Sequence, residues 1–171
     1  MNSLFHKYCL PVLASALFLP VSALAQSSDN DSCSDATLKG DYAFRISGQI
    51  LPPGKAPIQR EGIAMTHFDG AGNLTQVDFV VADGVPVGGP TDAVTGFHLD
   101  ETGTYKVFSD CTGEAEIRFP APPGIRSGAI IDLKFVLSDC GRKIHTIVSK
   151  LVPPGASKAV PASIHSDAEK L

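Results

Sequence analysis

The stretch from Thr102 to Leu151 decides the fold of this chain, and it reads TGTYKVFSDCTGEAEIRF, PAPPGIRSGAI and IDLKFVLSDCGRKIHTIVSKL in succession. In its first part, Ala115, Ile117 and Phe119 alternate with charged residues. The last part repeats the alternation, with apolar side chains at every odd position from 131 to 137. A period of two is typical of strands that bury one face. Because a Pro/Gly-rich connection joins the two runs, we predict an antiparallel pair.

The register of this pair places two cysteines near one another. If Phe119 lies opposite Ile130, Cys111 is roughly level with Ser138, about two residues from Cys140. Disulfide bonds need Cα atoms closer than about 7 Å, because a longer gap requires backbone movement. The hairpin geometry therefore predicts a disulfide between Cys111 and Cys140 at the open end of the pair.

Residues 1–25 have the features of a signal peptide. His6 and Lys7 give a weakly basic start, an apolar stretch covers 9–19, and an Ala-Leu-Ala cleavage site ends at Ala25. The apolar stretch is shorter than the ~20 residues that a membrane-spanning helix needs. We therefore predict export to the periplasm or the medium, with no membrane span.

Composition restricts the classes of partner. The chain has 171 residues with 14 Lys and Arg against 18 Asp and Glu, a net charge of −4, and no basic run. This balance argues against nucleic acid and against anionic membrane surfaces as partners. Its 16 glycines and 13 prolines suit short strands joined by turns. Nothing in the sequence predicts a cofactor.

Cysteine usage leaves more than one pairing open. Cleavage of the signal peptide removes Cys9, and the odd count that remains implies one pair and one leftover. Cys33 paired with either Cys111 or Cys140 is the alternative to the bond that the hairpin favours. A zinc site is the competing use of three cysteines, but no CxxC or HxxxH spacing supports it, so no metal site is predicted.

The remaining segments predict further strands and few helical residues. A polar leader over 26–40 ends in one helical turn near Ala36–Lys39. Alternating or apolar runs predict strands at 42–50, 59–69, 74–82, 85–87, 94–99 and 142–152. The sequence DGAGN at 69–73 predicts a tight hairpin, and 100–103 another turn. No periodicity survives beyond Pro153, so 153–171 is interpreted as a disordered tail.

This pattern predicts an all-β fold. Seven or eight strands, mostly joined by hairpins, either close into an antiparallel up-and-down barrel or stack as a β-sandwich. We favour a barrel over 41–152, because pairing the first strand with the last leaves no exposed edge.

Several short motifs carry a resemblance to known proteins. They are CSDATLKGDY at 33–42, FDGAGN at 68–73, GTYKV at 103–107 and DCTG at 110–113. With them the chain resembles, over about residues 33–150, a group of small exported bacterial proteins without assigned activity. That group is similar to calycin-type barrels near the allene-oxide-cyclase-like class. The resemblance implies a barrel, and because the position of Cys140 is often not cysteine in the group, it favours a bond between Cys33 and Cys111.

Three side chains are candidates for ligand binding. His67 and His145 each lie within a predicted strand, and if both faced a barrel interior they could exchange protons near neutral pH. Arg118 would line a polar interior able to hold an anion if the barrel were inverted. The alternative for all three is a place on the solvated exterior.

Three functions fit these patterns. The first is an exported, non-catalytic barrel that binds a small apolar or amphipathic ligand, since about eight strands leave room for one. The second is an envelope or extracellular interaction module that uses the loops at 51–57, 83–92 and 120–129. The third, implied by the resemblance alone, is a cyclase or isomerase that holds one substrate conformer.

Overall fold

The computed structural model describes residues 32–171, so the predicted signal peptide lies outside the described residues. After a single 3-10 turn, η1 (Asp35–Thr37), the chain forms nine strands. They are β1 (Lys39–Ile50), β2 (Ile58–Asp69), β3 (Asn73–Ala82), β4 (Val85–Pro86), β5 (His98–Val107), β6 (Thr112–Arg118), β7 (Ile130–Ser138), β8 (Lys143–Val152) and β9 (Ala162–Lys170). The all-β class that the sequence predicts is confirmed.

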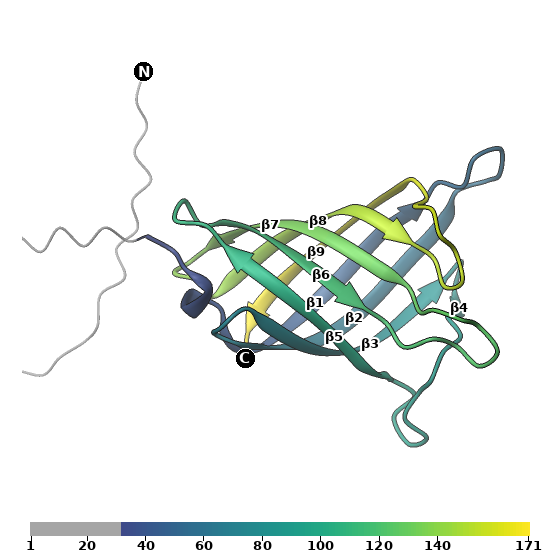
Figure 1. Cartoon of the computed structure of the whole chain (residues 1–171), viewed down its shortest axis with the longest axis horizontal. Helices are drawn as coiled ribbons and strands as arrows, with labels where there is room; N and C mark the ends of the chain where they lie inside the picture. Colours follow the sequence, from purple (N-terminus) through teal and green to yellow (C-terminus); the bar gives the residue numbers. More distant parts are fainter. Residues whose placement is uncertain (1–31) are drawn as a thin grey trace, which may run out of the picture.

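Eight of the strands close into one antiparallel barrel (Figure 1). Each of the eight pairs with the next barrel strand along the chain, and the two-residue β4 forms a short antiparallel pair with the end of β3. β1 pairs with β2 on one side and with β9 on the other, which closes the circle. The structure is therefore the up-and-down barrel and not the sandwich.

The strand that closes the barrel comes from the region interpreted as a tail. The prediction of disorder over 153–171 is wrong for 162–170, which form β9 between β1 and β8. Buried Ile164 and Ala168 alternate with exposed residues, so the period of two is present. At Gly48, a Cβ atom would lie 2.1 Å from the carbonyl oxygen of Ser163, so the close approach of β1 to β9 requires glycine there. The barrel accordingly extends beyond its predicted limit at 152.

The β5 strand also differs from its prediction. A strand at 94–99 and a turn at 100–103 were expected, but one strand runs continuously from His98 to Val107. Asp100 has a φ of +61°, and the register against β3 shifts at this place. A β-bulge therefore stands where a turn was predicted, and the chain continues through it.

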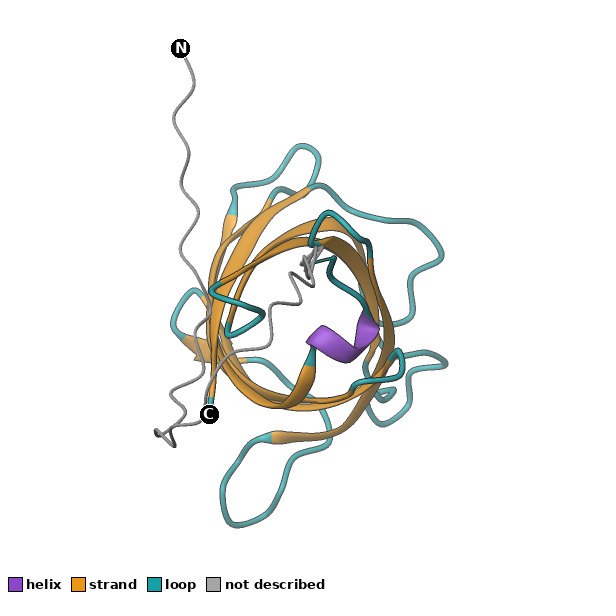
Figure 2. Cartoon of the chain, turned by 90° about the vertical axis from the view of Figure 1, so that its left-hand side faces the viewer, coloured by secondary structure: helices purple, strands orange, loops and turns teal. Residues whose placement is uncertain are grey.

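Aromatic side chains and η1 fill one end of the barrel. Figure 2 faces this end and shows the helical turn lying across the opening. Leu38 and Tyr42 are wholly buried, and Phe68 makes edge-to-face contacts with Tyr42 and Tyr105 at centroid distances of 5.3 and 5.0 Å. The hydroxyl of Tyr105 donates to the carbonyl oxygen of Leu38 at 2.9 Å. This end is consequently closed by packed side chains.

A disulfide fixes the segment before η1 to the same end. Cys33 is bonded to Cys111, with Cα atoms 5.0 Å apart, so the predicted Cys111–Cys140 bond is wrong and the alternative forms. The physical reason lies in the N-terminal segment, which crosses to the turn between β5 and β6. There the backbone N–H of Cys33 donates to the carbonyl oxygen of Ser109. The register of the hairpin could not predict this contact, because Cys33 lies outside the hairpin.

The opposite end of the barrel carries the longer connections. They cover 51–57, 83–97, 119–129 and 153–161, and all of them gather at one end in Figure 1. Among residues 32–171, no helix is long and apolar enough to cross a membrane.

Proline substitution tests whether β9 is a strand of the barrel. We expect His165→Pro to lower the free energy of unfolding by about 1–3 kcal/mol, because proline removes a ladder hydrogen bond and leaves the facing carbonyl group without a donor. Ser157→Pro, at another exposed position but in the loop before β9, is the matched control and should change stability little. Urea unfolding followed by circular dichroism measures both, and equal effects of the two variants would contradict the assignment of β9.

Asp35 gives the closed end a pH dependence. Its carboxylate accepts hydrogen bonds from the backbone N–H of Val107 at 2.7 Å and from Nζ of Lys106 at 3.0 Å, and these lower its pKa. Because its pKa is lower in the folded than in the unfolded protein, ionised Asp35 stabilises the fold at any pH above its unfolded-state pKa of about 3.9. This stabilisation is lost as the pH falls through the pKa that Asp35 has in the folded protein. We expect Asp35→Asn to cost about 1–2 kcal/mol at pH 7 and progressively less toward pH 3. Exposed Asp100→Asn is the control, and a cost for Asp35→Asn that did not change with pH would refute this account.

Candidate functional site

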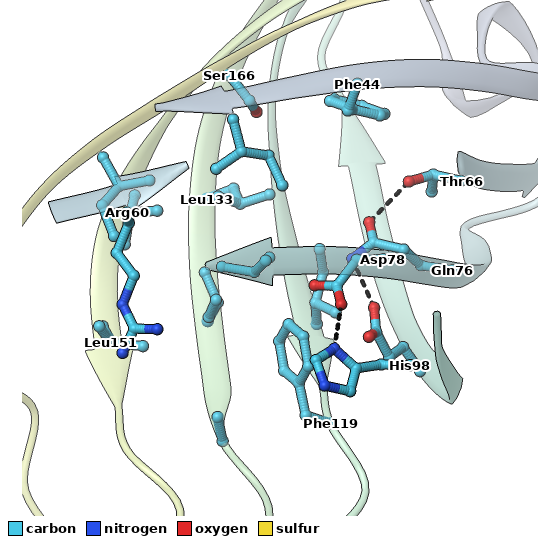
Figure 3. A pocket seen from close by; sticks show the side chains of 18 of the residues that line it. Phe44, Arg60, Thr66, Gln76, Asp78, His98, Phe119, Leu133, Leu151 and Ser166 are labelled. Carbon is cyan, nitrogen blue, oxygen red and sulfur yellow. Dashed lines mark hydrogen bonds and ion pairs between the residues drawn. The ribbon is translucent and has the colours of Figure 1, made fainter. Parts of the chain in front are cut away.

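A cavity of about 230 Å³ lies inside the barrel and reaches the end that carries the long loops. Its walls are mostly apolar, and Figure 3 shows side chains from several strands turned into it. The apolar residues that line the cavity include Phe44, Val80, Phe119, Leu133, Val148 and Leu151. An engineered apolar cavity of about 150 Å³ is large enough for benzene, so this one has room for a small organic molecule.

A cluster of polar side chains interrupts the apolar wall on β2, β3 and β5. Thr66, Gln76, Asp78 and Glu101 are each at most 9% exposed. The hydroxyl of Thr66 donates to Oε1 of Gln76 at 2.7 Å (Figure 3). Nε2 of Gln76 in turn donates to Oε2 of Glu101 at 2.7 Å. A buried polar group without a partner is costly, so this chain of hydrogen bonds fixes the orientation of the Glu101 carboxyl group.

His98 completes the cluster. Its Nδ1 lies 2.7 Å from Oδ1 of Asp78, and its Nε2 lies 3.0 Å from the carbonyl oxygen of Val87. Because a carbonyl can only accept, Nε2 carries a hydrogen and donates it. The side chains of His98 and Asp78 are 12% and 4% exposed, so the pair is shielded from water. We refer to Asp78, His98 and Glu101 as the polar triad.

The β-bulge explains how the polar triad converges. On β3, Gln76 and Asp78 are two residues apart and point to the same face of the sheet. On β5, their partners Glu101 and His98 are three residues apart, a spacing that would put them on opposite faces of a regular strand. The bulge at Asp100 absorbs the extra residue and turns His98 back toward the interior.

Burial changes the protonation of Glu101. The pKa of Glu101 is raised to about 9, first by loss of solvation and then by the charge of the adjacent Asp78 carboxylate and a hydrogen bond between the two side chains. The hydrogen bond from Gln76 acts in the opposite direction. Glu101 is therefore a neutral acid at pH 7 when only protons are present. One of its oxygens, Oε1, has no hydrogen-bond donor among the described residues.

Arg60 adds a separate polar contact, on β2. Its side chain lines the cavity, and Figure 3 shows it on the far side of the cavity from His98. Its Nε is buried without an acceptor in the described part of the chain. Burial lowers the pKa of Arg60, against the opposing effect of the Asp83 carboxylate. The cavity thus has a cationic group apart from the polar triad.

The structure places the three predicted ligand-binding residues outside the barrel. The side chains of His67, His145 and Arg118 are 55%, 51% and 61% exposed, and they are not brought together in the cavity. Each pairs on the surface with a neighbouring carboxylate, from Asp41, Asp167 and Glu116 respectively. They take the exterior position that the sequence allows as the alternative, because the barrel has its apolar face inside and these positions belong to the other face. Ligand binding by these three residues stays a prediction.

The sequence contained one signal for the cluster. Gln76 and Asp78 share a face with Leu74 and Val80, so two polar residues stand in the middle of an apolar row on β3. Polar residues on the buried face of a strand mark a place where a partner is required. His98 gave no such signal, because its inward direction depends on the bulge.

Comparisons with known proteins add little to this geometry. No family model matches the chain, and no curated protein matches its sequence. Among solved structures, the chain is similar to the crystal structure of Rv2717c from M. tuberculosis, with 18% sequence identity and a TM-score of 0.39. The match covers 79% of this chain and 93% of that chain. At this level of likeness, nothing about this chain is inferred from it.

Removal of Gln76 tests the buried hydrogen bonds. We expect Gln76→Leu to lower the free energy of unfolding by about 2 kcal/mol, because Thr66 and Glu101 both lose a partner in a site closed to water. Gln59→Leu makes the same change at an exposed position on β2 and should have little effect. Chemical unfolding of both variants provides the measurement. A Gln76→Leu protein as stable as the Gln59→Leu protein would show that the network contributes nothing.

Proposed function

We propose that the barrel binds a small amphipathic molecule, with its apolar body in the cavity and an oxygen-bearing end at the polar triad. The observation that carries this proposal is the composition of the cavity. Its walls are mostly apolar, and the polar lining residues are the cluster on β2, β3 and β5, Arg60 opposite, and Thr146, His165 and Ser166 on β8 and β9. The hydroxyl groups of Thr146 and Ser166 are hydrogen-bonded to each other at 2.6 Å. Binding sites for small molecules typically combine apolar walls with a few convergent polar groups.

Two physical effects support a ligand with an apolar body and one polar end. Transfer of an apolar body out of water contributes about 25 cal/mol for each Å² buried, and this favours any hydrophobic molecule of suitable size. The polar cluster then adds selectivity, because a purely apolar occupant would form no hydrogen bond of its own with Glu101 or Asp78. An alcohol, carbonyl or carboxyl group on the ligand would provide one.

The closed end supports binding as well. η1, Tyr42 and Phe68 fill the barrel at one end, so a ligand would enter past the loops at the other. We also propose that the protein acts after export, which agrees with the predicted signal peptide and with the Cys33–Cys111 disulfide. The resemblance to allene-oxide-cyclase-like and calycin-type barrels is compatible with an internal ligand, and membership of that class is part of the proposal.

Binding of 1-naphthol tests the proposal, because this fluorescent probe joins a small apolar body to one hydroxyl group. We expect saturable binding, and about fivefold to tenfold weaker binding of naphthalene, since one net hydrogen bond is worth about 1–1.5 kcal/mol. Ala115→Phe fills the cavity from β6 and should abolish the binding of both probes. Ala43→Phe makes the same change on the exposed face of β1 and should leave it intact.

Two results would contradict the proposal. If neither probe binds, or if Ala115→Phe binds them as the unchanged protein does, the cavity is not a binding site. If naphthalene and 1-naphthol bind equally, the polar triad does not recognise the polar end of a ligand. Cooperative unfolding of both phenylalanine variants serves as the check that each retains its fold.

A further inference from the structure

We propose that Asp78, His98 and Glu101 form a binding site for one divalent transition-metal ion, of the Zn²⁺ class, in the wall of the cavity. The proposal concerns the protein without any organic ligand, so it stands or falls separately from the binding of an amphipathic molecule. Its basis is the convergence of three ligand atoms from two neighbouring strands.

The three side chains are close enough to share an ion. One atom from each, the imidazole nitrogen and a carboxylate oxygen from each acid, lies within 4.8 Å of the other two. Zinc binds imidazole nitrogen and carboxylate oxygen at about 2.0–2.2 Å. A small inward movement of the side chains would therefore complete three bonds, and the fixed strand register keeps the ligands together.

The hydrogen bond of His98 directs its free nitrogen into the site. Nε2 donates its hydrogen to the carbonyl oxygen of Val87, and in the metal-free protein a proton lies between Nδ1 and Oδ1 of Asp78, 2.7 Å apart. A metal ion would displace that proton and bind the lone pair of Nδ1. Metal-binding histidines commonly donate their other ring N–H to a backbone carbonyl or a carboxylate, which fixes the tautomer and the ring orientation. The contact with Val87 has this form.

Glu101 supplies the second, independent observation. The residue is 1% exposed, Gln76 occupies its Oε2, and Oε1 has no donor among the described residues. The neutral acid shares its proton with Asp78 in a hydrogen bond. The ionised carboxylate would leave Oε1 without a partner, which is rare for a buried oxygen. A metal ion bound by Oε1, Nδ1 of His98 and Oδ1 of Asp78 would provide that partner. The other oxygen of Glu101 stays hydrogen-bonded to Gln76, which is itself fixed by the hydroxyl group of Thr66.

Charge and ligand type indicate which ion fits. With a neutral histidine and two carboxylates, the site carries a charge of −2, which one divalent ion balances in surroundings that cannot solvate it. Imidazole together with carboxylates suits Zn²⁺ and related transition metals, whereas Ca²⁺ and Mg²⁺ prefer oxygen ligands alone. Three protein ligands leave a fourth tetrahedral position, which would face the cavity.

Titration of the metal-free protein with Co²⁺ at pH 7 tests this site. Cobalt is a spectroscopic substitute for zinc, and its visible absorption reports the number and type of its ligands. We expect one equivalent to bind with the spectrum of a nitrogen and oxygen site of low coordination number, and one equivalent of Zn²⁺ to displace it.

Two variants identify the ligands. Glu101→Gln preserves the size of the side chain but weakens the ligand, and we expect the dissociation constant to rise by about 100-fold or more. His145→Gln is the matched control, because His145 forms an exposed histidine–carboxylate pair with Asp167 in which Nδ1 and Oδ1 are 2.6 Å apart. This control should bind Co²⁺ as tightly as the unchanged protein.

The unchanged protein alone can overturn the proposal, so the result does not depend on whether a variant folds. Absence of a Co²⁺ spectrum at millimolar metal would show that only protons link the three side chains. Binding that His145→Gln removes and Glu101→Gln does not would place the metal on the surface. The Ala115→Phe variant, which fills the cavity, separates the two proposals if it keeps the metal and loses 1-naphthol.

Discussion

The pairing of β1 with β9 is the constraint on which the rest of the structure depends. Without it, the meander of strands would present two unpaired edges and an open apolar face, a combination that favours aggregation. With it, every barrel strand has a neighbour on both sides and the interior becomes a closed space. Gly48 allows the two strands to approach closely, because any side chain at this position would collide with the backbone of β9.

Closure divides the barrel into two parts with different roles. At one end, Leu38, Tyr42 and the Cys33–Cys111 disulfide fill and fasten the interior, which is where most of the buried aromatic packing lies. Toward the other end the side chains no longer fill the space, and the cavity begins. The polar triad lies in its wall, and the rigid ladder on either side holds those side chains at short distances. Recognition of a polar group or a metal ion requires this kind of preorganisation.

Much of the fold follows from the sequence, because alternation and turn residues are local signals. The strands at Ile58–Asp69 and Lys143–Val152 and the hairpin between β2 and β3 could be predicted in this way. β9 was missed because its inward residues, such as Ser166 and Ala168, are small or polar and give weak hydrophobic contrast. The site was harder to predict, because the His98 side chain points inward only as a result of a β-bulge, and no pattern in the sequence predicts that bulge. The disulfide was mispredicted because it joins a segment outside the barrel to a turn, and strand register says nothing about such a contact.

The most direct test of barrel closure is the pattern of backbone nuclear Overhauser effects between β1 and β9. The account predicts cross-strand contacts between Phe44 and Ala168 and between Gly48 and Ile164, the residues that face one another in the antiparallel register. It also predicts chemical shifts typical of a strand from 162 to 170. Random-coil shifts over that segment, with no contacts to β1, would contradict the closed barrel and the cavity that depends on it.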